Sequence, residues 1–443
     1  MKSVRQAAFE ILLNILKNQA YSNIAVDSAI ETGKLNETDA SFLSALVYGT
    51  IEKTIGIDYN LELYLTQPIH KLRPEILTVL RLGAYQLLFM NRIPVSAAVN
   101  ESVKIIKNTK LSFASGMVNA VLRKISINGF TLPAVNRYLD YLSIKYSCPV
   151  WLINFWTSSY GIDNTIGVLE NSLTRAPSYA RVNISKISAE ELISVLFEAG
   201  IESEIHEEYF NTITIKKRGT IEALDSYRDG LFHLQDLSSQ LFCSALGAKV
   251  GDVIFDLCAA PGGKSFTLAQ QVGETGKVFA FDIHESRLEL IQQGARRLNL
   301  TNITMNIGDA SVFNPKLGFA DIVVCDVPCS GLGVIRRKPE IRFKEAANID
   351  KLPELQYFIL CNASSYVKLD GLLAYSTCTL NPKENEDICN RFLQNHSDYF
   401  TLHKSNIVTG IMGEKYTTLL PHINNSDGFF FAIFKRTGLN DCQ

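Results

Sequence analysis

The sequence predicts a multidomain protein with an all-α bundle at its N-terminus, a small α+β unit in the middle and a doubly wound α/β domain at its C-terminus. Three observations lead to this prediction. The chain has 443 residues, enough for about three domains of ~150 residues each. Apolar residues recur at three- and four-residue steps across residues 1–128, which is typical of amphipathic helices. From about residue 236 onward, short apolar strands alternate with helices, which indicates a mostly parallel sheet.

Composition excludes several protein classes. Apolar residues make up 47% of the chain and charged residues 20%, so large cores can form and extensive disorder is not expected. The net charge of −2 argues against a protein that coats nucleic acid indiscriminately, but it permits local basic patches. Residues 71–124 carry nine Lys or Arg against two Glu, residues 331–344 carry five against one, and residues 216–218 form a third cluster. Each patch could also be an ordinary solvated surface.

The first residues and the cysteines bear on where the protein works. Residues 1–19 alternate charged and apolar residues as an amphipathic core helix does, and they lack the pattern of a signal peptide. Arg81 interrupts the longest apolar stretch, so we expect no membrane span. The nine cysteines are scattered and none forms a C-x-x-C pair, which argues against a disulfide framework and against a zinc site. We therefore expect a cytoplasmic protein without a metal.

The first part of the chain is predicted to be a helical bundle. Helical spacing of apolar residues covers ranges 8–16, 40–55, 57–65, 74–90, 97–106 and 114–125. Pro74 and Pro94 stand where two of these helices should begin. Residues 129–174 are also helical in pattern but less regular. We assign residues 1–128 to the bundle and residues 129–174 to a helical bridging element.

The pattern changes at about residue 175. Strand-like segments at residues 178–184, 211–217 and 230–237 surround a helix at 188–200, which predicts a small α+β unit over 175–235. The α/β domain is assigned to residues 236–437. Its expected strands lie at residues 252–259, 277–283, 303–309, 319–328, 371–378 and 429–436, with helices between them.

Reactive side chains gather where these strands end. In an open parallel sheet, ligands bind beyond the carboxyl ends of the strands. The residues at these ends are Asp256, Cys258, Asp282, Asp309, Asp326, Cys329 and Cys378. Turn residues would be more usual in a purely structural sheet, so this set favours a site. Cys325 lies inside a strand, where core packing is expected.

The turn after the first strand, "CAAPGGKS" at residues 258–265, suits a cofactor. Small residues and two glycines let the backbone approach a ligand, although the spacing fits neither a G-x-G-x-x-G nor a P-loop pattern. Asp282 lies twenty residues after Gly262, where an acid can accept hydrogen bonds from ribose hydroxyls. Asp309 ends the third strand and is placed to contact an adenine amine. A nucleoside cofactor without a pyrophosphate cradle indicates S-adenosylmethionine rather than NAD.

The thiols suggest the reaction. Carbon 5 of a pyrimidine is a poor nucleophile, but a thiolate that adds to carbon 6 activates it for attack on a methyl sulfonium. Cys378 and Cys329 supply thiols on neighbouring strands, and Asp326 supplies a carboxylate. Pro382 is expected to open the next helix, whose N-terminus would favour a thiolate at Cys378. The basic stretch at residues 331–344 could hold a phosphate backbone next to this chemistry.

Four segments resemble a known family. "DLCAAPGGKS", "DVPCSGLGVIRRKPEI", "YSTCTLNPKENE" and "DGFFFAIFKR" together resemble the RNA (cytosine-5)-methyltransferases of the bacterial Sun/RsmB (Fmu) type. Residues 1–128, with "VYGTIEK" and "LRLGAYQLLFM", look like the family's bundle, which is similar to the antitermination factor NusB. The segment with "APSYARVN" resembles the family's small RNA-recognition-like unit. The expected fold is therefore a NusB-like bundle, this small unit and a Rossmann-like methyltransferase domain.

The resemblance also implies roles for individual residues. The S-adenosylmethionine site would comprise Cys258, Ala259, Ala260, Pro261, Gly262, Gly263, Lys264, Asp282, Asp309 and Asp326. Asp326 would also hold the cytosine edge, Cys378 would be the nucleophile, and Cys329 would assist release of the covalent RNA adduct. The implied substrate is one cytosine of 16S ribosomal RNA.

Other interpretations stay open from the sequence. The same chemistry could act on transfer RNA or on a small molecule, although the basic stretches and extra domains speak against the latter. A different class is an RNA-binding regulator that uses the bundle as an antitermination factor does and keeps a vestigial methyltransferase domain. The three intact residues Asp326, Cys329 and Cys378 argue against that interpretation. The sequence does not determine the oligomeric state, and a monomer is favoured.

Overall fold

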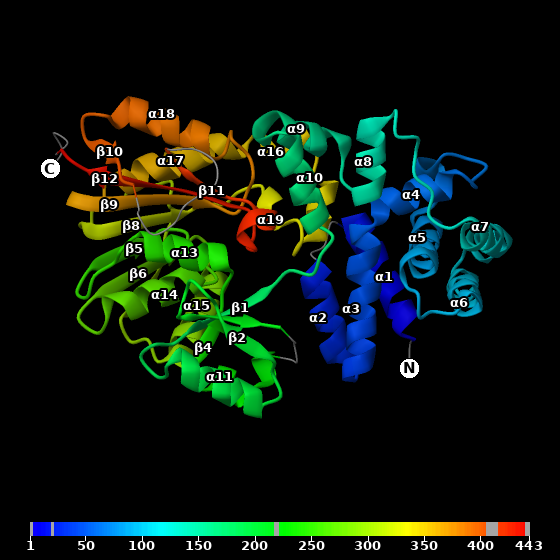
Figure 1. Ribbon diagram of the computed structural model, residues 1–443, viewed down its shortest axis with the longest axis horizontal. Coiled ribbons are helices and arrows are strands. Elements are labelled where there is room, and N and C mark those ends of the chain that lie inside the picture. Colours follow the sequence, from blue (N-terminus) through cyan, green and yellow to red (C-terminus); the bar gives the residue numbers. More distant parts are fainter. Residues whose placement is uncertain (1–2, 19–21, 217–220, 405–414, 439–443) are drawn as a thin grey trace. The chain divides into compact units, whose positions relative to one another are not determined.

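The computed structural model describes residues 3–18, 22–216, 221–404 and 415–438. These residues form two compact units, one of residues 1–173 with 337–346 and one of residues 174–336 with 347–443 (Figure 1). Lys217 and Arg218 of the third basic cluster lie outside the described residues. The expected division of the chain into four parts stays a prediction. The first compact unit contains both the bundle and the bridging helices, and the second contains both the small α+β unit and the α/β domain.

The first unit is helical, as predicted. Its helices are α1 (Val4–Asn18), α2 (Ser22–Gly33), α3 (Glu37–Glu52), α4 (Thr54–Glu62), α5 (Pro74–Phe89), α6 (Val95–Lys107), α7 (Ser115–Asn128), α8 (Tyr138–Tyr146), α9 (Val150–Tyr160) and α10 (Ile162–Asn171). Helix α5 is the centre of the bundle and packs against α1, α3, α4, α6 and α7. Pro74 occupies the first turn of α5 and Pro94 caps α6, because a proline fixes the helical φ and needs no amide partner there.

A segment from the second half of the chain completes the first unit. Residues 337–346 contain a short 3₁₀ helix, η5 (Pro339–Phe343), which packs against α3. Ser22 donates a hydrogen bond to Glu340 over 3.0 Å. Arg342 is 3% exposed, and its Nη2 donates to the backbone oxygen of Ser172 over 3.3 Å and to its hydroxyl over 3.1 Å. Arg342 therefore holds the unit together, and the prediction that this part of the basic stretch contacts RNA phosphates is wrong for Arg342.

A four-stranded antiparallel sheet begins the second unit. Its order is β2 (Ser203–Ile205), β3 (Thr212–Ile215), β1 (Ser178–Val182) and β4 (Phe232–Leu234), with helices α11 (Ala189–Glu198) and α12 (Asp225–Arg228). A capping box starts α11, in which Ser188 and Glu191 satisfy each other's backbone amides. The apolar faces of β1, β3 and α11 form a core of their own. The predicted small α+β unit is present.

The larger sheet has the order β10-β12-β9-β8-β5-β6-β7, with β11 paired to β12. Strands β5 (Val253–Asp256), β6 (Lys277–Asp282), β7 (Ile303–Ile307), β8 (Ala320–Asp326) and β9 (Val367–Thr377) are parallel. The strand β12 (Phe429–Arg436) runs antiparallel to β9, and two strands that the sequence did not predict, β10 (Phe400–Leu402) and β11 (Thr417–Leu419), pair with β12. The predicted doubly wound sheet is thus present with a mixed edge.

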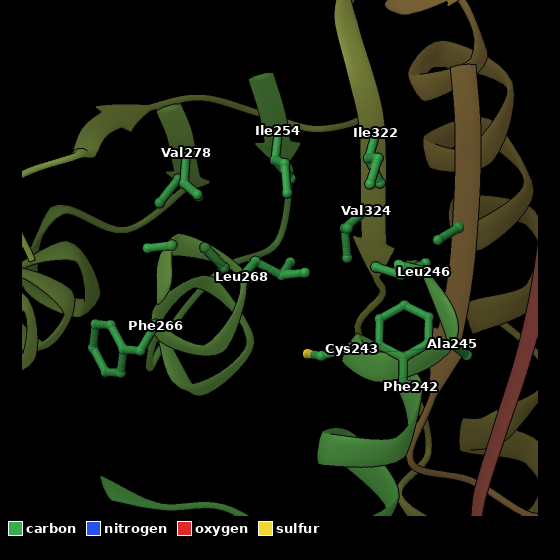
Figure 2. Packing of buried hydrophobic residues seen from close by; sticks show 14 of the residues in the cluster. Phe242, Cys243, Ala245, Leu246, Ile254, Phe266, Leu268, Val278, Ile322 and Val324 are labelled. Carbon is green, nitrogen blue, oxygen red and sulfur yellow. The ribbon is translucent and has the colours of Figure 1, made fainter. Parts of the chain in front are cut away.

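Helices cover both faces of this sheet (Figure 1). One face packs against α13 (Leu237–Ala245), α14 (Gly263–Val272) and α15 (Glu285–Leu298), and the other against α17 (Leu352–Ser364) and α18 (Glu386–His396). Two short helices, α16 (Ala346–Ile349) and α19 (Pro421–Asn424), lie in the connections. Figure 2 shows the first face, where Phe242 and Cys243 of α13 lie near Val324 of the sheet. Burial on both faces explains why the strands are continuous apolar runs.

The small sheet is fastened to the α/β domain by polar contacts. Asn183, just after β1, donates to the carbonyl oxygens of Gly230 and Leu298, each over 2.9 Å. Arg297 donates to the carbonyl oxygens of Tyr227 over 2.6 Å and Phe232 over 2.9 Å. A Cβ at Gly230 would lie 1.9 Å from the carbonyl oxygen of Arg297, so only glycine permits this approach. The two sheets therefore form one rigid support.

Candidate active site

The turn after β5 is shaped by glycine and proline. The Ala260–Pro261 peptide bond is cis, and Gly262 has a φ of 109°, a conformation that side chains rarely adopt. A Cβ at Gly262 would lie 2.5 Å from the ring of Phe266. Helix α14 begins at the next residue, so its free amide groups face the turn. The predicted cofactor loop thus has the close backbone and the helix start that the sequence indicated.

A cavity of about 380 Å³ lies beyond the ends of β5, β6 and β7. Its wall includes Phe281, Gly308, Asp309 and Phe313. Asp309 is held by Ser311, whose amide and hydroxyl donate to Oδ1 over 2.9 and 2.6 Å, and these hydrogen bonds lower the pKa of its carboxyl group. An ionised carboxylate at the edge of an apolar, aromatic-walled cavity suits the amino group of an adenine.

Asp282 ends β6 beside this cavity. It is 4% exposed, accepts a hydrogen bond from the amide of His284 over 3.0 Å and pairs with Arg287 at 3.3 Å. The amide of Gly308 donates to the backbone oxygen of Asp282 over 3.1 Å, which brings the ends of β6 and β7 together. The structure thus places Asp282 at the end of β6, as the sequence predicted, and Asp309 two residues after the end of β7 rather than as its last residue. Together with the glycine turn, these residues fit a nucleoside cofactor.

An ion pair links the cofactor loop to the end of β8. Lys264 Nζ lies 2.6 Å from Asp326 Oδ2, and Ser376 of β9 donates to Asp326 Oδ1 over 2.8 Å. Burial by itself lowers the pKa of Lys264, but the charge and hydrogen bond of Asp326 outweigh it and raise that pKa. The side chain of Asp326 is 30% exposed and that of Lys264 only 11%. Asp326 can therefore accept further hydrogen bonds from a ligand, while Lys264 holds its side chain in place.

The two candidate thiols meet in the structure. Cys329 Sγ and Cys378 Sγ are 3.3 Å apart, and both residues are partly accessible. The hydrogen bond with Cys378, followed by burial and by the nearby groups Cys378, Glu384 and Asp326, raises the pKa of the Cys329 thiol well above its ordinary value. Cys329 is therefore a basic group that binds a proton strongly. Cys325 is fully buried in the strand, which confirms its prediction as core.

A buried carboxylate that the sequence interpretation missed holds the two thiol loops together. Glu384 is fully buried. It accepts hydrogen bonds from the amide and hydroxyl of Ser330, from Gln356 Nε2 over 2.8 Å and from Asn381 Nδ2 over 2.7 Å. Ser330 follows Cys329 directly, and its hydroxyl also lies 2.7 Å from that of Thr379. The sequence shows a glutamate between two asparagines in an expected turn, but the neighbouring residues give no indication that its side chain is buried.

Two glycines bring a third segment to the thiols. The amide of Gly333 donates to the carbonyl oxygen of Cys378 over 3.1 Å, and the amide of Gly428 donates to the carbonyl oxygen of Gly333 over 2.9 Å. A Cβ at Gly333 would lie 2.0 Å from the carbonyl oxygen of Gly428. The "SGLG" and "DGFF" segments are thus held together by contacts that exclude any larger residue.

The expected start of the helix after Cys378 is wrong. Helix α18 begins at Glu386, not at Pro382. Residues 382–385 form turns instead, in which the amide of Glu384 donates to the carbonyl oxygen of Asn381 over 2.9 Å. These turns bury the Glu384 side chain, and a helix from Pro382 would not place it there. The helix N-terminus still lies close to Cys378, because its N-cap residue Asn385 accepts a hydrogen bond from Thr377 over 2.6 Å and donates to the carbonyl oxygen of Thr379 over 2.9 Å.

Comparisons with known proteins agree with this architecture. Family models match residues 243–435 (16S rRNA methyltransferase RsmB/F), residues 2–126 (NusB family) and residues 148–222 (the ferredoxin-like domain of RsmF/B-like methyltransferases). The resemblance inferred from the motifs is thereby confirmed for all three parts. Within the described ranges, no helix is both long and apolar enough to cross a membrane. Over the same ranges, no group of three or more His, Cys, Asp or Glu side chains could hold a metal ion.

Individual relatives extend over nearly the whole chain. The probable ribosomal RNA small subunit methyltransferase B of Bacillus subtilis is 34% identical, covering 98% of this chain and 99% of that protein. The Escherichia coli ribosomal RNA small subunit methyltransferase B is 30% identical over 90% of this chain and 91% of its own. Among solved structures, PH0851 matches with a TM-score of 0.83, 25% identity, and coverage of 98% of this chain and 99% of that one. NSun6 from Pyrococcus horikoshii, solved with SFG, matches in fold with a TM-score of 0.61 and 21% identity over 66% of this chain and 99% of its own.

Proposed function

Because the chain belongs to the RsmB/F family of ribosomal RNA methyltransferases and uses S-adenosylmethionine, we propose that it methylates carbon 5 of one cytosine in 16S ribosomal RNA. The observation that carries the proposal is the pair of thiols, Cys329 and Cys378, 3.3 Å apart on loops that follow neighbouring strands. A ribosomal RNA substrate also makes the cytoplasm the place of action.

Cys378 is the proposed nucleophile. Its thiolate adds to carbon 6 of the cytosine and forms a carbon–sulfur bond, and the electron pair of the 5,6 double bond becomes available at carbon 5. When bound, S-adenosylmethionine supplies the methyl group to this carbon. A substrate for this step must lie with carbon 6 against Cys378, which requires a group that fixes the opposite edge of the base.

Asp326 is the proposed group that fixes that edge. Its carboxylate already accepts hydrogen bonds from Lys264 and Ser376, and it is open enough to accept another from the exocyclic amine of cytosine. Uracil carries an oxygen at that position, so the same carboxylate would repel it, and this difference favours cytosine.

Cys329 is the proposed proton acceptor. After methyl transfer, carbon 5 carries both a methyl group and a proton. A Cys329 thiolate accepts that proton, the electrons restore the double bond, and the bond to Cys378 breaks. Because the pKa of Cys329 is raised, its thiol must first release its own proton to solvent, and the thiolate formed then binds the carbon-5 proton strongly.

The cofactor would be held by the turn after β5 and by two carboxylates. The amide groups at the start of α14 and the glycines of the turn would approach the amino-acid part. Asp282 would accept from the ribose hydroxyls, and Asp309 would accept from the adenine amine at the cavity of about 380 Å³. Lys264 lies between this loop and Asp326, so it joins the two halves of the proposed site.

Single-cysteine variants test the mechanism. Cys378→Ala should abolish methyl transfer to 16S ribosomal RNA while S-adenosylmethionine still binds, as calorimetry would measure. Cys329→Ala should trap RNA as a covalent adduct, visible as a shifted band on a denaturing gel. Substantial turnover by Cys378→Ala would overturn the assignment of the nucleophile. Bisulfite mapping of the product would identify the methylated cytosine, and equal activity on transfer RNA would overturn the choice of substrate.

A further inference from the structure

A second cavity, of about 180 Å³, lies between the small sheet and α13. Arg181 of β1, Thr212 of β3, and Gln240 and Ser244 of α13 contribute to its wall, together with Phe210. None of these residues has a part in the cofactor cavity or in the thiol pair. Arginine, threonine, glutamine and serine side chains, all of which can bind polar groups, therefore line a cavity that the proposed reaction does not use.

Arg181 is the unusual member of this cavity. It is 8% exposed, and its Nε is buried without a hydrogen-bond partner among the described residues. Burial lowers the pKa of its guanidinium, and among the described residues the thiol of Cys243 is the ionisable group that opposes this effect. A buried cation without a counterion costs several kcal/mol unless an anion joins it. In the part of the chain that the structure describes, Arg181 thus has no carboxylate partner of the kind that normally accompanies a buried arginine.

Polar groups beside Arg181 are arranged to help bind an anion. The hydroxyl of Thr212 donates to Gln240 Oε1 over 2.7 Å, and Gln240 Nε2 donates to the carbonyl oxygen of Gln235 over 3.0 Å. These bonds fix the Gln240 side chain. Ser244 makes no side-chain hydrogen bond to another described residue and lies only partly buried at the wall. Its hydroxyl can donate to an anion that pairs with Arg181.

An aromatic side chain stands beside this cationic group. Phe210 is 73% exposed although it lines the cavity. Burial and, as a smaller cause, the neighbouring carboxylate of Glu208 raise the pKa of Tyr209. Glu208 is not among the groups that change the pKa of Arg181. An exposed aromatic face beside a buried arginine is the combination that binds one nucleotide, with stacking for the base and an ion pair for the phosphate.

The cavity is connected to the cofactor loop through one side chain. Cys243 is close to both Arg181 and Lys264, because burial raises the pKa of its thiol and both cations lower it, and its Sγ lies 3.9 Å from the carbonyl oxygen of Lys264. Figure 2 shows Cys243 on α13 beside the sheet. A ligand held by Arg181 is therefore attached to the rigid part of the molecule that also positions Lys264 and Asp326.

We propose that this cavity binds one unpaired nucleotide of the substrate RNA outside the target cytosine, with its phosphate on Arg181 and its base on Phe210. The proposal rests on the proposed function, because the RNA is taken to be the substrate. Phosphate binding supplies affinity and register, whereas stacking requires an unpaired base. The enzyme would thus select a single-stranded segment on the same rigid support that carries the catalytic groups.

Two variants of the full-length enzyme test the proposal by RNA affinity. Phe210→Ser and Arg181→Met should each weaken binding of a single-stranded 16S ribosomal RNA fragment about tenfold, within the range of stacking losses. Arg181→Met should also lower the slope of log affinity against log salt by about one, whereas Phe210→Ser should leave that slope unchanged. Phe197→Ser is the matched control, because Phe197 lies on α11 of the same small domain, is 79% exposed and does not line the cavity.

Fluorescence anisotropy measures the affinity, and calorimetry with S-adenosylmethionine shows whether the cofactor site is intact. Unchanged RNA affinity for Phe210→Ser, a surface change that should fold normally, would overturn the proposal. In another outcome, inorganic phosphate stabilises the wild type, and Arg181→Met abolishes this stabilisation but leaves RNA affinity unaffected. That outcome would overturn the RNA assignment in favour of a small phosphate ligand. Wild-type enzyme that binds this RNA but methylates no cytosine would refute the proposed function and leave this site standing.

Discussion

Glu384 offers the sharpest test of how the thiol loops are positioned. Its carboxylate accepts hydrogen bonds from Ser330, Gln356 and Asn381, which come from three different segments. Oε1 accepts from the Ser330 hydroxyl and from Asn381, and Oε2 accepts from the Ser330 amide and from Gln356. We consider the substitution Glu384→Gln, because it preserves the volume and changes only the acceptors.

The cost follows from this hydrogen-bond pattern. Whichever way the glutamine amide is oriented, its NH₂ group replaces one oxygen and faces two former donors. Hydrogen bonds to charged groups are worth about 1.5–3 kcal/mol each, so the loss of two amounts to about 3–5 kcal/mol once their coupling is allowed for. With about 2–4 °C per kcal/mol for a domain of 150–250 residues, the melting temperature of the second unit should fall by about 6–20 °C.

Activity should fall as well, because Ser330 directly follows Cys329 and also bonds to Thr379 next to Cys378. Below the melting temperature, kcat should decrease at least tenfold, while the affinity for S-adenosylmethionine stays within about twofold. Thermal unfolding, methyl incorporation at saturating cofactor and calorimetry measure the three quantities. Glu386→Gln is the control, since this carboxylate two residues further on accepts only a long hydrogen bond of 3.4 Å from Thr418 within the described residues.

The reasoning would be refuted if Glu384→Gln melted within about 2 °C of the wild type, or if its kcat matched that of Glu386→Gln. Either outcome would mean that the loops hold their arrangement without the carboxylate. A lower melting temperature combined with an unchanged kcat would show that Glu384 stabilises the domain but does not position the thiols.

Three further predictions concern single residues. Gly333→Ala should lower the melting temperature by several degrees, because its Cβ would lie 2.0 Å from the carbonyl oxygen of Gly428. Gly116→Ala is the control and should not lower it, because position 116 has open space around it. Thermal unfolding compares the two variants. Asp309→Asn should weaken S-adenosylmethionine binding about tenfold with little change in stability, as calorimetry would measure, since the amide presents donors to the adenine amine. Burial, only partly offset by a hydrogen bond from Ser265, raises the pKa of Asp256 to about 6 from its ordinary 3.8. The folded state therefore favours the protonated form and loses stability as the pH rises from about 4 to 6. Urea unfolding of Asp256→Asn across that range should show a flatter dependence of stability on pH.

The strand ends were largely predictable from the sequence. Asp256, Asp282 and Asp326 are the last residues of β5, β6 and β8, where the apolar run that is buried on both faces of the sheet stops. The core role of Cys325 followed from the same rule, and its complete burial confirms it. Local pattern sufficed for these residues because their position in the strand decides their environment.

Residues whose environment depends on distant segments were not predictable. Arg342 stands in a basic run that indicates a solvated surface, yet α10 and α3 bury it. Lys264 was assigned to the cofactor loop alone, although its partner Asp326 follows 62 residues later. Glu384 follows Pro382, where a helix was expected to begin, and it is buried against Gln356 from α17. In each case a tertiary contact outweighs the local preference of the residue.

The distance between the two thiols depends on strand register. Near the carboxyl ends of β8 and β9, Asp326 of β8 pairs with Ser376 of β9. Cys329 therefore lies three residues beyond its paired position and Cys378 two residues beyond, so their side chains can meet. The pairing is not constant along these strands, because Ala320 pairs with Val367 but Ile322 pairs with Leu372. Three extra residues of β9 are thus accommodated at the opposite end of the strands.

This irregularity decides the geometry of the proposed active site. If the pairing of Ala320 with Val367 continued without it, Asp326 would lie opposite Leu373, and Cys378 would be displaced by three residues, or about 10 Å at 3.3 Å per residue. An odd shift would also turn the side chains of β9 to the opposite face of the sheet. Gly371 makes the shift possible, because a Cβ there would lie 2.8 Å from the carbonyl oxygen of Asp321. The approach of Cys329 to Cys378 is therefore fixed by backbone pairing at the start of β9, outside the segments that carry the chemistry.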